Sequence, residues 1–177
     1  MLIQQCPHLQ DLEIQLEEVN IPFLSTLFTG KWPRLSRFTL NLSTSLWIQA
    51  SDELQESFAV FVETHKCIES LVINFPPLIS PQCVNLGLHP NLRHLFAPRV
   101  EFLDHLFPRG VPDTLEYLNF HGTNTYIPPF SDPSGLHTVV MAMNHLEAIR
   151  PSLRALPSTI RRFKLSVPMT SPWVCGC

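Results

Sequence analysis

The segment WPRLSRFTL, residues 32–40, places its large apolar side chains at Leu35, Phe38 and Leu40. These residues are three and then two positions apart, whereas a helix repeats its apolar residues every three or four positions and a strand every two. Pro33 restricts the backbone just ahead of the first of them. The spacing therefore predicts a turn that leads directly into a short strand.

The same spacing occurs seven times along the chain. The first apolar residue of the copies lies at positions 9, 35, 68, 92, 115, 136 and 160, so successive copies start 26, 33, 24, 23, 21 and 24 residues apart. A step of this size is the signature of a repeat architecture. We therefore expect repeats over residues 1–166 and a frayed tail over residues 167–177. The predicted strands lie near residues 12–15, 38–41, 71–74, 95–97, 118–121, 139–142 and 163–166.

Two of the segments between the copies have the apolar spacing of an amphipathic helix. The first covers residues 21–28, and Gly30 is expected to end it. The second covers residues 52–65, and either Ser51 or Asp52 can cap its start. This longer helix accounts for the step of 33 residues between the second and third copies.

Shorter helical patterns occupy residues 102–107 and 146–156, whereas the proline-rich stretches PPLISP and YIPPF predict irregular structure. Each unit thus consists of a strand, then a helix or loop that returns the chain to the start of the next strand. Parallel neighbouring strands require a crossover of this kind. The predicted fold class is α/β, with stacked units that bury a continuous core between strands and helices.

The pattern LxxLxL at this step resembles the leucine-rich repeat, from about Leu9 to Leu165. That resemblance implies a solenoid shaped as a horseshoe arc, with a parallel sheet on its concave face and helices or irregular loops on its convex face. The phrases CPHLQDLEI, WPRLSRFTL and HPNLRHL are, more narrowly, similar to the C-terminal repeats of fungal (basidiomycete-type) F-box proteins.

The F-box resemblance implies a protein–protein interaction module, namely the substrate-recognition repeats of a ubiquitin-ligase adaptor. We match no segment of this chain to an F-box, and Leu2 and Ile3 have the character of the tail of a preceding helix. The chain is therefore expected to be a fragment, and a ubiquitin-ligase scaffold is a partner only if an F-box lies upstream. The alternative is a generic intracellular leucine-rich-repeat scaffold or regulatory protein unrelated to ubiquitin.

Composition narrows the class of partner and the compartment. The chain of 177 residues is 45% hydrophobic and 15% charged, with a net charge of -3, which does not suit a phosphate-binding surface. It has no apolar run of membrane-spanning length and no signal-peptide pattern. Its five cysteines are scattered, which favours a reducing compartment. We expect an intracellular protein, cytoplasmic or nuclear, that binds a protein of unknown identity and neither nucleic acid nor membrane.

Residues that could carry chemistry do not form a recognisable set. His89 and His94 lie near Cys83 but lack the ligand spacing of a zinc site. Gly30 and Lys31 lack the other residues of a phosphate-binding loop. No serine lies in a nucleophile elbow. We therefore predict no metal, no cofactor and no catalytic residues, and a protein that is not an enzyme.

The predicted binding surface consists of the strand residues that alternate with the apolar ones, since these line the concave face of a solenoid. Its centre is aromatic and polar, and its ends are charged, as in an interface core with a polar rim. The plain alternative is that these residues only keep the sheet soluble, with Phe96 and Tyr117 packed on each other. The candidate partner-binding residues are Arg37, His94, Phe96, Tyr117, Asn119, His121, Arg162 and Lys164.

Overall fold

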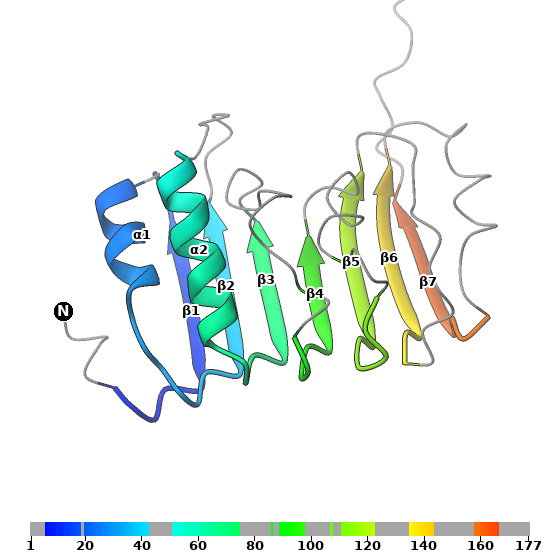
Figure 1. The fold of residues 1–177 in the computed structure, drawn as a ribbon. Helices are drawn as coiled ribbons and strands as arrows, with labels where there is room; N and C mark the ends of the chain where they lie inside the picture. The colour runs from blue at the N-terminus through cyan, green and yellow to red at the C-terminus, as the bar shows by residue number, and fades with distance from the viewer. Residues whose placement is uncertain are drawn as a thin grey trace, which may run out of the picture.

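The computed structural model of the chain describes residues 6–18, 20–42, 51–74, 86, 89–97, 107, 111–122, 135–143 and 158–166. Seven parallel strands form one sheet in the order of the sequence, and two helices lie side by side on one of its faces (Figure 1). The predicted α/β class with a parallel sheet is thus confirmed. The elements are β1 Asp11–Leu16, α1 Ile21–Phe28, β2 Arg37–Leu42, α2 Asp52–Thr64, β3 Ser70–Asn74, β4 His94–Ala97, β5 Tyr117–Gly122, β6 Thr138–Met143 and β7 Arg162–Ser166.

Each strand contains the range that the repeat spacing predicts, and the register of the sheet follows the repeat. The second apolar residues of the copies are paired across all seven strands, as Leu12 with Phe38 and Val139 with Phe163 illustrate. A shift of one residue would turn every side chain to the opposite face, so this common register aligns the apolar side chains on one side. The two faces of the sheet therefore differ consistently from β1 to β7.

The apolar side of the sheet forms the core together with the helices. The first apolar residue of each interior unit is fully buried, at 0% exposure, as are most of the second and third. These first residues are Leu35, Ile68, Leu92, Leu115 and Leu136. One continuous cluster joins them to the buried side chains of both helices.

A tight turn precedes the strand in the first five units, as the three-then-two spacing predicts. In the segment that opens at Trp32, the N–H of Leu35 donates to the Trp32 carbonyl at 3.0 Å, with Pro33 at the second position of the turn, a favoured place for proline. Equivalent bonds close the turns that end at Leu9, Ile68, Leu92 and Leu115. The turn allows the first apolar side chain to enter the core before the strand begins.

The two helices start at the residues that cap them. The Asn20 side chain accepts a hydrogen bond from the N–H of Phe23 at 3.0 Å, and the Ser51 hydroxyl accepts one from Leu54 at 3.3 Å. Ser51, rather than Asp52, is therefore the cap of α2. Helix α1 has the predicted bounds, whereas α2 ends one residue earlier than predicted, at Thr64.

Gly30 has a different role from the predicted one. Helix α1 ends at Phe28, and Thr29 caps it in a right-handed conformation, with φ -81° and ψ -9°. A Cβ atom on Gly30 would overlap the indole ring of Trp32, which is 1% exposed. The glycine is thus required for close packing of the indole, and not for the left-handed residue that often ends a helix.

Several predictions fall on residues that the structure does not describe. The helical patterns at residues 102–107 and 146–156, both proline-rich stretches and the predicted tail lie outside the described residues, except for buried Phe107. Within the described ranges, neither helix is long and apolar enough to cross a membrane.

Candidate partner-binding face

We use the term open face for the side of the sheet opposite α1 and α2. Its residues alternate with the buried apolar ones along each strand, from Asp11 and Glu13 on β1 to Arg162 and Lys164 on β7. Most of its side chains are exposed or half-buried, although Thr138 is only 8% exposed. The predicted binding residues with described side chains all lie on this face.

The centre of the open face is a polar and aromatic cluster on β4 and β5. His94 and Tyr117 are direct neighbours in the register, and their ring centroids are 6.1 Å apart. The Asn119 amide donates to the Tyr117 hydroxyl at 3.2 Å. The His94 ring is exposed and the other two side chains are half-buried. The structure therefore brings together three of the predicted residues in one contiguous group.

Phe96 extends this cluster along a row in which three of the four central residues are apolar. In the register it lies between Val72 on β3 and Asn119 on β5, and Val140 on β6 follows. All four side chains are half-buried. The alternative interpretation has Phe96 packed on Tyr117. In the register these two residues are diagonal, because Asn119 is the direct neighbour of Phe96 and His94 that of Tyr117.

The Asn119 amide oxygen is energetically unfavourable in this cluster. It is buried from solvent and has no hydrogen-bond partner among the described residues. A buried acceptor without a partner costs about 1–3 kcal/mol. This cost is consistent with a residue kept for a purpose other than stability, as binding residues often are.

Arg37 lies apart from the central cluster. Its guanidinium forms an ion pair with Asp11 on β1 at 2.6 Å, and its Nε also donates to Asp11 at 2.8 Å. Both side chains are well exposed, at 66% and 51%, so the pair contributes little to stability. Arg37 is two strands from His94, which places it at the rim of the open face.

Arg162 and Lys164 lie on β7, two strands from Tyr117 in the sheet order. Both side chains are exposed, and Arg161 beside them is exposed as well. His121 is paired with Ala142 in the register, but its side chain is outside the described part of the structure. The predicted residues therefore form a centre and two separate charged edges rather than one site.

A charged row at the start of the strands was missed. Arg93 forms an ion pair with Glu116 at 2.8 Å, and His137 lies 3.9 Å from the same carboxylate. These residues follow the first apolar residue of successive copies. Their position in the repeat, one residue before the strand, was the signal that could have identified them.

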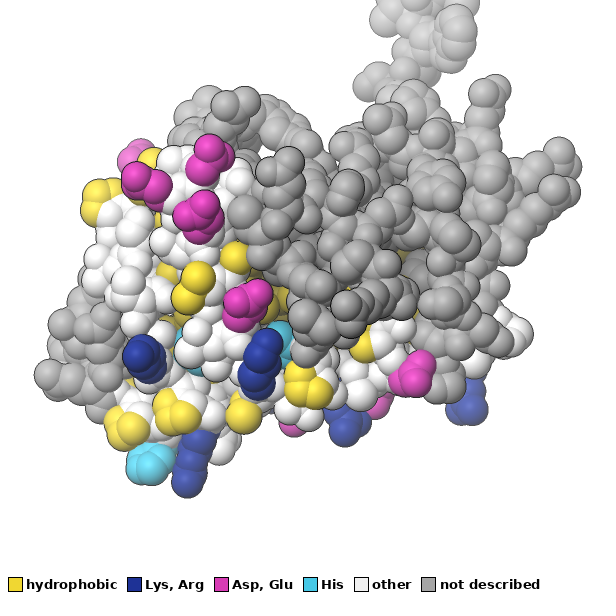
Figure 2. Space-filling view, in the orientation of Figure 1, with side chains coloured by type: hydrophobic (Ala, Val, Ile, Leu, Met, Phe, Trp, Pro, Cys, Tyr) yellow, Lys and Arg dark blue, Asp and Glu magenta, His cyan; other side chains and the backbone are white. Residues whose placement is uncertain are grey.

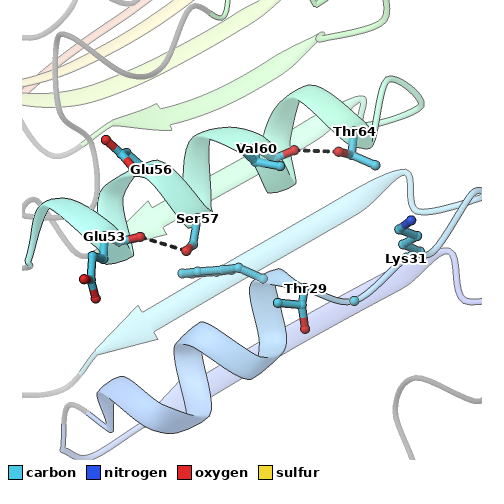
Figure 3. Close-up of a pocket in the computed structure, with 9 residues that line it drawn as sticks. Thr29, Lys31, Glu53, Glu56, Ser57, Val60 and Thr64 are labelled. Atoms are coloured by element: carbon cyan, nitrogen blue, oxygen red, sulfur yellow. Dashed lines mark hydrogen bonds between the residues drawn. The ribbon is translucent and has the colours of Figure 1, made fainter.

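A groove lies on the helix side of the sheet, between the end of α1 and the length of α2 (Figure 3). This groove of about 470 Å³ has Phe28 and Val60 as its apolar lining, and Val60 is 59% exposed. The Ser57 and Thr64 hydroxyls donate to backbone carbonyls of α2. Acidic side chains gather at the N-terminal end of α2, whose first turn holds Asp52 and Glu53 (Figure 2). The lining contains no paired nucleophile and base.

Among the described residues, the histidines and cysteines do not come together as ligands of a metal ion. His89 is buried beneath α2 with its Nε2 atom 3.1 Å from the Val62 carbonyl, whereas His94 is exposed on the open face. Across the described ranges, no group of three His, Cys, Asp or Glu residues is placed to hold a metal ion.

Comparisons with known proteins add no relative: no family model, no curated protein and no solved structure matches the chain significantly.

Proposed function

We propose that this chain is a leucine-rich-repeat solenoid that works as a protein–protein interaction module, with the open face as its binding surface. The observation that carries the proposal is the central cluster of His94, Phe96, Tyr117 and Asn119. Its side chains are half-buried or exposed on a face opposite both described helices. A patch of aromatic and amide side chains within a charged rim has the composition of an interface core.

The uniform register supports this proposal, because it arranges side chains of different types in rows on one surface of the sheet. Each strand contributes one residue to each row, and backbone hydrogen bonds on both sides hold the interior strands. Residues fixed in this way lose little conformational entropy when a partner binds. The rigid rows suit recognition of a protein surface or an extended segment.

In its more specific form, the proposal assigns the chain to the substrate-recognition repeats of an F-box-type ubiquitin-ligase adaptor, intracellular and without catalytic residues. Its support is the similarity of CPHLQDLEI, WPRLSRFTL and HPNLRHL to the repeats of fungal F-box proteins. The second candidate is an intracellular repeat scaffold or regulatory protein unrelated to ubiquitin. Both candidates use the same binding face, and they differ in whether a ubiquitin-ligase scaffold is recruited.

The binding face is tested by comparing three forms of the chain as bait in an extract of the source cells. The forms are the wild type, the double variant Phe96→Ser with Tyr117→Ser, and the control Val60→Ser. Val60 is an exposed apolar residue on the opposite side of the molecule. We expect a defined set of proteins to bind the wild type and the control but not the double variant.

If the double variant, with an unchanged melting temperature, retains the same proteins, the open face is not the binding surface. The ligase assignment needs a separate measurement, which is the sequence of the transcript upstream of Met1. An in-frame F-box there, together with recovery of a ubiquitin-ligase scaffold with the full product, supports the adaptor. An in-frame stop codon close upstream supports the scaffold candidate instead.

A further inference from the structure

The sheet has two edges at which core residues are less buried than elsewhere. Within the described residues, β1 pairs only with β2 and β7 only with β6. Leu12 and Ile14 on β1 are 8% exposed, and Phe163 and Leu165 on β7 are half-buried. Where the side chain is described, the equivalent residues of the five strands between them are 0–2% exposed. Among the described residues, each edge therefore presents backbone groups without a strand partner, beside apolar side chains that are less buried than those of the interior strands.

The two edges also carry opposite charge at equivalent positions. Asp11 and Arg162 occupy one row of the sheet, and Glu13 and Lys164 occupy the next. All four side chains are exposed. Charges of opposite sign attract across neighbouring strands, whereas like charges repel. The charges thus favour contact of β1 with β7 and oppose contact of either edge with its own kind.

The contact between β1 and β2 shows that such an ion pair can form across neighbouring strands. Arg37 and Asp11 lie in the same row on adjacent strands, and their charged groups are 2.6 Å apart. Arg162 has the same position in the last unit that Arg37 has in the second. Asp11 of a docked copy would therefore lie one strand spacing away from Arg162. Lys164 and Glu13 would be neighbours in the same manner.

The backbone at the edges is complementary as well. The carbonyl one residue before each strand accepts N–H bonds from two residues of the next unit. The Gln10 carbonyl accepts from Ser36 at 2.8 Å and from Arg37 at 2.9 Å, and the His137 carbonyl serves Arg161 and Arg162 in the same way. The Arg161 carbonyl is the corresponding acceptor at the β7 edge. The N–H groups of Gln10 and Asp11 are the corresponding donors at the β1 edge.

We propose that a second copy of this chain docks edge to edge, with its β1 parallel to β7 of the first copy. Asp11 then faces Arg162, Glu13 faces Lys164, and the apolar side chains of the two edges cover each other. The contact joins two different surfaces, so each copy keeps one open edge and association continues beyond a dimer. This interface is separate from the central cluster of the open face and does not depend on the proposed binding function.

The test uses sedimentation velocity of the 177-residue chain over a wide concentration range at low ionic strength. Two single charge reversals, Glu13→Lys and Lys164→Glu, leave the Asp11–Arg37 ion pair intact. When either variant is present alone, the side chains at positions 13 and 164 have the same sign of charge and face each other at every contact between copies. We therefore expect about tenfold weaker association. When the two variants are mixed, unlike charges meet at every contact and association should return to the wild-type level. Glu56→Lys, on the exposed side of α2, is the matched control and should associate as the wild type does.

The proposal is supported if wild-type association is reversible on dilution, is reduced by added salt and follows this pattern of loss and recovery. A wild-type chain that remains monomeric at every concentration overturns it. Association that stops at a closed dimer also overturns it, because a head-to-tail contact does not close. So does a mixture of the variants that associates no better than either one alone while thermal melts show both variants folded.

Discussion

The backbone N–H of Trp32 donates a hydrogen bond to Nε2 of His65, 3.0 Å away and one repeat further along the chain. The other ring nitrogen, Nδ1, lies 2.6 Å from the Phe61 carbonyl of α2. A carbonyl only accepts, so Nδ1 carries the proton and Nε2 is the acceptor. His65 is therefore held as one neutral tautomer that ties the turn before β2 to the end of α2. A second proton on this ring would remove the bond to Trp32.

Stability should consequently fall in mild acid. Burial lowers the pKa of His65 and also that of His89, from an ordinary value of 6.5, and nearby backbone carbonyls oppose the shift only in part. Because these pKa values are lower in the folded state, the unfolded chain takes up protons first. The contribution of the neutral histidines to the free energy of unfolding is fully present above about pH 6.5. As the pH falls below this value, the free energy of unfolding decreases by up to ~1.4 kcal/mol per pH unit for each histidine. Urea unfolding at a series of pH values measures this slope.

Replacing His89 with Gln should reduce this slope, because the buried imidazole whose pKa is lowered by folding is then absent. Equal slopes for the wild type and His89→Gln would show that His89 does not contribute to the loss of stability in acid.

Truncation of two adjacent residues on β2 should lower stability by very different amounts. Phe38 is 0% exposed and its ring centroid lies 4.9 Å from that of Phe61, so Phe38→Ala is expected to cost ~3–5 kcal/mol. Arg37 makes only an exposed ion pair, so Arg37→Ala is expected to cost less than ~1 kcal/mol. Denaturant unfolding of both variants gives the two values. Similar losses of stability for the two variants would contradict the assignment of Phe38 to the buried face of β2 and Arg37 to the exposed face.

A glycine between two turns should be intolerant of a methyl group. A Cβ atom on Gly135 would overlap the backbone carbonyl of Asp113 in the preceding turn. A backbone atom cannot move aside as a flexible side chain can, so Gly135→Ala is expected to cost ~2 kcal/mol or more. Ser158→Ala, in an exposed turn of the next unit, should change the free energy of unfolding by less than ~0.5 kcal/mol. Equal thermal melts of the two variants would contradict this packing.

The strands and the inward-facing residues on them could be predicted because the repeat spacing encodes them directly. One pattern, seen in Leu35, Phe38 and Leu40, fixes both the turn and the inward face of the strand that follows. Contacts between repeats carry no such local signal. The bond from Trp32 to His65 joins residues that are far apart in the sequence and whose types are unrelated. The role of Gly30 depends on a ring two residues later, which spacing rules for helix ends do not consider.

The candidate site was predictable to the same extent. Strand alternation placed His94, Tyr117 and Asn119 on one face because the pleat has a period of two. It could not show that Asn119 donates to Tyr117 or that its amide oxygen is buried, since both depend on rotamers. Nor could it show that Arg37 is already paired with Asp11, at a distance from the centre.

Asn119 should limit the stability of the sheet while it serves the central cluster. Asn119→Val removes the buried amide oxygen that has no partner and places a β-branched side chain in a row with Phe96 and Val140. We expect the free energy of unfolding to rise by ~1 kcal/mol. The same change frees the Tyr117 ring from its hydrogen bond, so partners held by the open face should bind more weakly. Unfolding and bait experiments on the same preparation measure both effects.

Thr39→Val is the matched control, because Thr39 occupies the same row on β2 and is half-buried. It should leave partner binding unchanged, since it lies outside the central cluster. If Asn119→Val lowers stability instead, the amide oxygen has a partner in solution and the cluster is better satisfied than the described contacts indicate. A rise in stability with unchanged binding would show that the Asn119–Tyr117 bond does not orient the ring for recognition.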